Sequence, residues 1–236
     1  EDRVGEVEIR IGVSQVLILI AFMFSYVLAM SAAFLAAPAI ASDVETGTVH
    51  AMLARPLRRA ELVVGRWLGL SIVIGAYAAL SGLLAIAVVA LVSGHLPPQP
   101  FMAIGYLTFE AVAVLTVALT LGTRLPAMAA GAISVVLFGV GWFVGVLGNV
   151  AVAFDAQALY RATEAFRFLL PTDGLWRGVI FGLEPPLVLL MSVGRTAEAN
   201  PFFAPTPPPA AFTAWSVVWV LLVLAAGVAL FRRREL

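Results

Sequence analysis

The sequence contains neither cysteine nor lysine, and each absence excludes a class of site. Without cysteine, none of its 236 residues can form a disulfide in an external loop or supply a thiolate to a metal. All fourteen basic residues are arginine. A Walker A loop needs a lysine to contact the nucleotide phosphates, and Schiff-base catalysis needs one too. The chain therefore has no conventional ATPase site of its own, and we do not expect it to be an enzyme.

Charge is also scarce in this chain. Charged residues make up 12% of the sequence, about half the usual share, whereas 62% of the residues are hydrophobic. The net charge is zero, which gives no electrostatic reason to expect nucleic-acid binding. Several apolar runs of about 20 residues are long enough to cross a hydrocarbon core about 30 Å thick. The sequence predicts an all-α, polytopic helical membrane protein with a single transmembrane domain over residues 1–236.

Five membrane spans are expected, at residues 14–38, 63–92, 101–121, 127–150 and 213–231. Residues 6–11 alternate between charged and apolar side chains, as a short strand or an interfacial lead-in would. Between the last two spans, residues 151–212 predict two short amphipathic helices. Asp155 is expected to cap the first helix, and the second follows Thr172 and contains Trp176. These helices are expected either to cover an exit path or to lie on the outer leaflet.

The arginines indicate which side of the membrane each loop occupies. If residues 42–66 are cytoplasmic, alternation of the spans places the turn at Arg124 and the C-terminal tail on the same side. These three segments hold eight of the fourteen arginines, mostly in short loops. The positive-inside rule therefore predicts that residues 42–62 and the C-terminus are cytoplasmic and that residues 151–212 are external.

The most charged segment before the C-terminal tail is residues 42–66, between two apolar runs. Ser42 with Glu45 three residues later forms a capping-box pattern, which predicts a short helix that starts near Asp43. That helix should end at Arg55, because the residue before a proline is pushed out of the helical region. An ordinary positive loop would explain the arginines, but not a capped helix, a Gly-Thr pair and a proline within such a short distance.

Three stretches of this segment carry a family resemblance: Glu45-Thr46-Gly47-Thr48, Arg55-Pro56-Leu57-Arg58-Arg59-Ala60-Glu61-Leu62 and Gly65-Arg66-Trp67-Leu68-Gly69. Together they resemble the ABC type-2 permease family, whose members typically carry an acidic residue before Gly-Thr, then Pro, Arg and a Gly-Lys pair. Arg66 stands where the family usually has lysine, and either residue places one positive charge at the inner interface.

The resemblance implies a half-transporter of the plasma membrane. It would pair with a second permease copy, as a homodimer or heterodimer, and with separate ATPase subunits that bind ATP and Mg²⁺. We expect it to export a substrate that the sequence does not identify. Energy would pass through a coupling segment at residues 42–62, carried by Asp43, Glu45, Thr46, Gly47, Thr48, His50, Arg55, Pro56, Arg58, Arg59 and Glu61.

Two further expectations follow from the resemblance. Members of the family usually have six spans, and the five visible here follow the order of spans two to six. We therefore expect a further span before Glu1, which would give six in the full-length protein. The large external region is most similar to that of the permeases associated with copper-enzyme maturation.

Glu110 is the one acidic or basic side chain deep inside an expected span. Such a residue suggests a functional site because a buried carboxylate must be neutral or paired. At helical spacing it shares a face with Tyr106 and with Ala103 and Ala113, whose small side chains leave room beside it. One alternative is a protonated acid that is hydrogen-bonded to a neighbouring Ser, Thr or Tyr. The other, which we favour slightly, is a substrate pathway that includes Glu110 and Tyr106.

Two other classes of function stay open at this stage. A proton-coupled secondary carrier could use Glu110, although the internal repeats and broken helices typical of such carriers are not visible. A non-transporting membrane assembly factor or intramembrane enzyme is the other alternative, but the spans lack paired carboxylates. No metal site is expected, since His95 has no second His or Cys nearby. Gly141, Gly145 and Gly148 have the spacing of a helix-packing contact.

Overall fold

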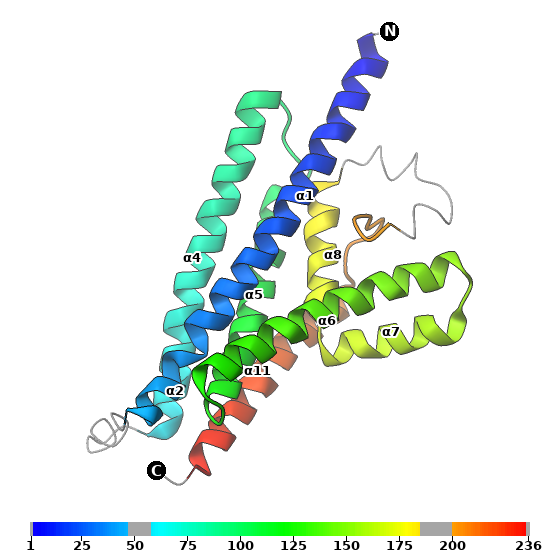
Figure 1. Ribbon diagram of the computed structural model, residues 1–236. Helices are drawn as coiled ribbons and strands as arrows, with labels where there is room; N and C mark the ends of the chain where they lie inside the picture. The colour runs from blue at the N-terminus through cyan, green and yellow to red at the C-terminus, as the bar shows by residue number, and fades with distance from the viewer. Residues whose placement is uncertain (1, 47–57, 185–199, 235–236) are drawn as a thin grey trace.

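The computed structural model describes residues 2–46, 58–184 and 200–234 (Figure 1). Within these residues, five helices are long and apolar enough to cross a membrane, which confirms the all-α class and the number of visible spans. The spans are Ile11–Val44, Arg59–Ser93, Pro100–Gly122, Ala127–Ala153 and Ala210–Arg232.

The first span consists of two helices, α1 (Asp2–Ala36) and α2 (Pro38–Glu45), and it corrects two expectations. The alternating residues 6–11 are part of α1 and form neither a strand nor a separate lead-in. Ser42 does not cap a helix that begins near Asp43; it lies inside α2, where its hydroxyl donates to the Pro38 carbonyl oxygen over 2.5 Å. Pro38 explains the boundary between the two helices, because proline lacks an N–H and is favoured at the first helical position.

Within the described residues, four longer helices and two shorter ones follow. Helix α4 (Arg59–Ser93) ends at Gly94, whose φ of 69° lies in the left-handed region that favours glycine. Helix α5 (Pro100–Gly122), α6 (Ala127–Ala153) and α11 (Ala210–Arg232) are the remaining spans. Between α6 and α11 lie α7 (Gln157–Leu169) and α8 (Thr172–Leu183).

Helix α5 occupies the centre of the bundle. It packs against α1, α2, α4, α6, α8 and α11 (Figure 1). About 61% of its most apolar stretch is buried, compared with 22–39% for the other spans. Its small residues permit this close packing; for instance, Gly122 lies so near the Ala37 carbonyl that a Cβ there would approach the oxygen to 2.5 Å.

Helices α7 and α8 are joined by a short turn at Leu170 and Pro171, and we call this pair the α7–α8 hairpin; α8 lies inside the bundle, whereas most of α7 is exposed. α7 packs along α6, and α8 packs along the first half of α5 (Figure 1). Nearly all of α8 is buried, including Trp176, which is only 2% exposed and stacks near Phe22. The expectation that this helix lies on the outer leaflet is therefore wrong. The N-cap position of α7 is Ala156 and not Asp155, which precedes it with a positive φ.

The glycines of α6 make room for this hairpin, as their spacing predicted. A side chain at Gly145 would overlap the Asp173 carboxylate, and one at Gly141 would press on Thr172 and Leu170. A Cβ at Gly148 would lie about 3.0 Å from the Thr163 hydroxyl. The three glycines thus form the surface of α6 on which the α7–α8 hairpin is seated.

We predict that Gly145→Ala destabilises the protein by about 1–3 kcal/mol, because overpacking a tight contact forces its neighbours to move. The matched control is Gly139→Ala on the same helix, where no atom lies within 4 Å of an added Cβ. Thermal unfolding of the purified protein in detergent would measure both. Equal melting temperatures for the two variants would contradict the proposed close packing of α8 against Gly145.

Candidate functional site

One end of the bundle gathers the ends of four helices and most of the described residues expected to couple to an ATPase. There α2 ends, α4 begins, and α5 and α11 end (Figure 1). We call this end the arginine face, defined by Arg58, Arg59, Arg66 and Arg234 together with Asp43.

Arg59 binds the end of α11. Its Nη1 donates to the carbonyl oxygens of Phe231, Arg232 and Arg234, over 3.5, 3.2 and 2.7 Å. The last carbonyls of a helix have no partner within the helix and carry a partial negative charge. The Arg59 guanidinium supplies both hydrogen-bond donors and a positive charge to these carbonyls. This contact joins the start of α4 to the end of α11.

Arg234 does the same for α5, since its Nη1 donates to the Thr123 carbonyl oxygen over 2.6 Å. On the other side of the face, an ion pair between Arg66 and Asp43 joins α4 to α2. Glu61 accepts a hydrogen bond from the Arg58 backbone N–H over 3.0 Å, as the acidic member of a capping box does. Four helix ends are thus tied together by side chains.

Six of the eleven expected coupling residues lie within the described residues. Asp43, Arg58, Arg59 and Glu61 lie on the arginine face, and Glu45 and Thr46 end α2, where the Thr46 hydroxyl donates to the Ser42 carbonyl. The remaining five, Gly47, Thr48, His50, Arg55 and Pro56, lie outside the described residues. The sequence did not indicate that Arg59 and Arg234 bind helix ends. The run of arginines after the last span was the one relevant feature, and we used it only to assign the C-terminus to the cytoplasmic side.

Glu110 lies buried between α5 and α1, with 3% of its surface exposed. The Ser25 hydroxyl on α1 donates to its Oε2 over 2.7 Å. Tyr106, one turn earlier, places its hydroxyl 3.1 Å from that of Thr213 on α11, and its ring covers Gly178 of α8. These contacts are the kind expected of the structural alternative, in which Glu110 and Tyr106 join helices.

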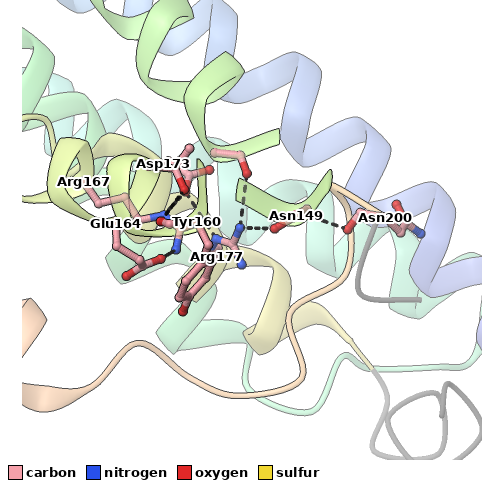
Figure 2. Close-up of polar contacts among 9 residues, drawn as sticks. Asn149, Tyr160, Glu164, Arg167, Asp173, Arg177 and Asn200 are labelled. Carbon is pink, nitrogen blue, oxygen red and sulfur yellow. Dashed lines mark hydrogen bonds and ion pairs between the residues drawn. The ribbon is translucent and has the colours of Figure 1, made fainter. Parts of the chain in front are cut away.

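A second polar cluster, missed by the sequence reasoning, holds the α7–α8 hairpin together (Figure 2). The Asp173 carboxylate accepts from Nε of Arg167 over 2.8 Å and from Nε of Arg177 over 3.2 Å. Arg167 also pairs with Glu164, and Arg177 donates to the Asn149 side chain of α6. Burial lowers the pKa of Arg177 below its ordinary value, and the charge of Asp173 opposes that effect.

The spacing of charged residues in the sequence could have predicted part of this cluster. Glu164 and Arg167 are three residues apart, and Asp173 and Arg177 are four apart, the spacings at which helical side chains meet. A cavity of about 360 Å³ lies beside the cluster, between Arg167, Arg177 and residues 205–209. The four ionic groups neutralise one another, so the cluster supplies a fixed, closely packed anchor.

Glu184 ends α8 and is buried, with 5% of its surface exposed. Its Oε2 accepts a hydrogen bond from the Ala204 backbone N–H over 3.2 Å, which connects α8 to the residues that lead into α11. Burial raises the pKa of Glu184 from 4.5 to about 7, and the hydrogen bond from Ala204 opposes this rise.

We predict that Glu110→Gln leaves stability close to that of the wild type, because the amide oxygen can still accept from Ser25. Ser25→Ala should lower the free energy of unfolding by about 1–3 kcal/mol, because it leaves the buried Glu110 carboxyl without its donor. Chemical denaturation in detergent would measure both variants. Loss of transport in a stably folded Glu110→Gln variant would instead support the pathway role of this residue.

We predict that Glu184 makes stability depend on pH. Its folded pKa of about 7 exceeds the ordinary value of 4.5, so its protonated form is favoured by folding. This contribution is fully present below pH 4.5 and is lost as the pH rises through about 7. Melting temperatures measured at pH 5 and at pH 8 should therefore differ less in Glu184→Gln than in the wild type. An unchanged difference would rule out this carboxyl as the source.

The chain is similar to a known protein family over nearly its whole length. A family model described as "ABC-2 family transporter protein" matches residues 6–236. The match therefore includes the arginine face, the α7–α8 hairpin and all five spans. No curated protein matches the chain.

Proposed function

This chain belongs to the ABC-2 family of transporter proteins, and from that premise we propose that ATP-driven motion enters it through residues 42–62. The family and the five apolar helices make it a multi-pass membrane protein and a transporter permease subunit, which works with an ABC ATPase subunit. ATP and Mg²⁺ would be bound by that ATPase subunit. The chain itself would supply the path across the membrane.

The observation that carries the proposal is the set of contacts on the arginine face. Residues 47–57 connect α2 to α4, and the Asp43–Arg66 ion pair holds these two helices together beside that connection. Arg59 then joins α4 to the end of α11, and Arg234 joins the α11 end to α5. A displacement applied between α2 and α4 would reach four spans through these contacts. Hence a partner that pushes on 42–62 could reorient the bundle.

We further propose that two such permeases pair in the plasma membrane, with residues 42–62 and the C-terminus cytoplasmic and with export as the direction. Support for a partner or lipid on the outer surface comes from the apolar side chains that α1 and α4 leave exposed. Val16, Met23 and Val27 on α1, and Ile72 and Leu80 on α4, are about half exposed or more. Charges that would prevent such contact are absent from those faces among the residues described here.

The alternatives have less support from these contacts. A proton-coupled carrier would use Glu110, yet this residue is held by Ser25 in a tightly packed part of the bundle. A pathway role for Glu110 and Tyr106 is therefore a proposal that rests on the room beside Ala103 and Ala113. A non-transporting assembly factor would not need a bound ATPase. Co-purification of the chain with an ABC ATPase would separate the permease from both alternatives.

We predict that Gly47→Val combined with Arg58→Ala lowers transport-stimulated ATP hydrolysis toward the rate of the ATPase alone. Membrane insertion should stay intact, because both positions lie outside the apolar spans. Arg58→Ala alone should have a small effect, since an exposed charge contributes under about 1 kcal/mol. ATPase assays in proteoliposomes would measure the rates.

Arg161→Ala is the matched control, an exposed arginine on α7 at a distance from the arginine face. Full stimulation in the double variant would contradict coupling through this segment. So would a cross-linking scan in which residues 42–62 reach only lipid.

A further inference from the structure

A groove lies between α4 and α11 at the arginine-face end of the bundle, and the proposed coupling role does not use it. Its volume is about 600 Å³. The floor is made of small and aliphatic side chains, among them Val64 from α4 and Leu224 and Val228 from α11. Arg232 and Arg233 line its end, where the last span closes.

Both of these arginines are exposed, and within the described residues neither guanidinium forms a hydrogen bond or an ion pair. Among the described residues, two acidic side chains at this end of the bundle are already engaged. Glu61 accepts from the Arg58 N–H, and Asp43 pairs with Arg66. The groove therefore ends in two positive charges that have no protein partner in this part of the chain.

The end of a helix usually repels an anion, because its carbonyl oxygens carry partial negative charge. Here Arg59 covers the carbonyl oxygens at the end of α11. This contact removes the main electrostatic obstacle to an anion beside Arg232 and Arg233. The combination of an apolar floor and a positively charged end is complementary to a molecule with a hydrocarbon chain and an anionic head.

We propose that this groove binds an anionic phospholipid. One acyl chain lies along Val64, Leu224 and Val228, and the phosphate contacts Arg232 and Arg233. A lipid is favoured over a soluble anion because α4 and α11 are both membrane spans, so their groove opens toward hydrocarbon. Arginines at the end of a span are positioned at headgroup depth, where basic residues attract anionic lipid.

Native mass spectrometry of the full chain, purified in detergent with added phosphatidylglycerol or phosphatidylcholine, tests the proposal. We expect the wild type to retain phosphatidylglycerol preferentially. Arg232→Gln combined with Arg233→Gln should weaken that retention by about 10- to 30-fold, from the usual contribution of basic residues at an anionic surface. The matched control, Arg161→Gln combined with Arg124→Gln, removes two exposed arginines that do not line the groove and should retain the lipid like the wild type.

A second variant tests the groove itself. Ala225 is exposed and lines the groove, so Ala225→Trp should block the acyl chain and lower retention while both arginines stay in place. Retention of phosphatidylglycerol by the double arginine variant at the wild-type level would overturn the proposal. Equal retention of the two lipids by the wild type would also overturn it.

The remaining occupant to exclude is a second copy of the chain. Because the sequence has no cysteine, Ala225→Cys introduces a single thiol at the groove. Under oxidation in nanodiscs that contain phosphatidylglycerol, we expect no disulfide between two copies. Efficient dimer formation through this thiol would show that a second copy covers the groove, and the lipid proposal would then be wrong.

Discussion

An apolar bundle offers its charged side chains little water, so the buried ones need partners, and several of these lie on other helices. This constraint explains the contacts that position the elements of the chain. Glu110 on α5 is held by Ser25 on α1, Asp173 and Arg177 connect α8 to α7 and α6, and Arg59 ties α4 to α11. Most of the surface between these helices is aliphatic and has little directional preference. The polar contacts select one arrangement among several that would bury similar apolar area.

The same constraint separates what the sequence predicts from what it does not. The number of visible spans follows from the apolar runs, and this expectation agrees with the structure. Local patterns failed where a stronger local signal or a long-range contact decided the structure. Ser42 had the spacing of a helix cap, yet the helix that began at Pro38 continues through it. Arg59 and Arg234 are 175 residues apart, and no local rule anticipates their contact.

The α7–α8 hairpin is the largest element whose position could not be predicted. Its helices were expected, because their helical pattern and proline boundaries are local features. The burial of α8 was not expected, because a helix this short cannot span a bilayer and so was interpreted as a surface element. Burial depends on pairs of close contacts with α5 and α6. Gly178 and Gly182 on α8 lie against Tyr106 and Ala103, while Gly145 on α6 accommodates Asp173. A glycine in one helix indicates such a contact only when the residue that packs against it in the other helix is known.

The depth of α8 also has a consequence for the order in which the protein is assembled. Neither α7 nor α8 is long enough to be recognised by the translocon as a span, and the charges of Asp173 and Arg177 oppose release into lipid. Helix α8 must therefore enter a space that α5 and α6 have already formed. Both of those helices precede it in the chain, and α11, which follows, closes the bundle by packing Phe212 over Gly174. The order of the elements along the polypeptide is thus the order in which vectorial synthesis can assemble them.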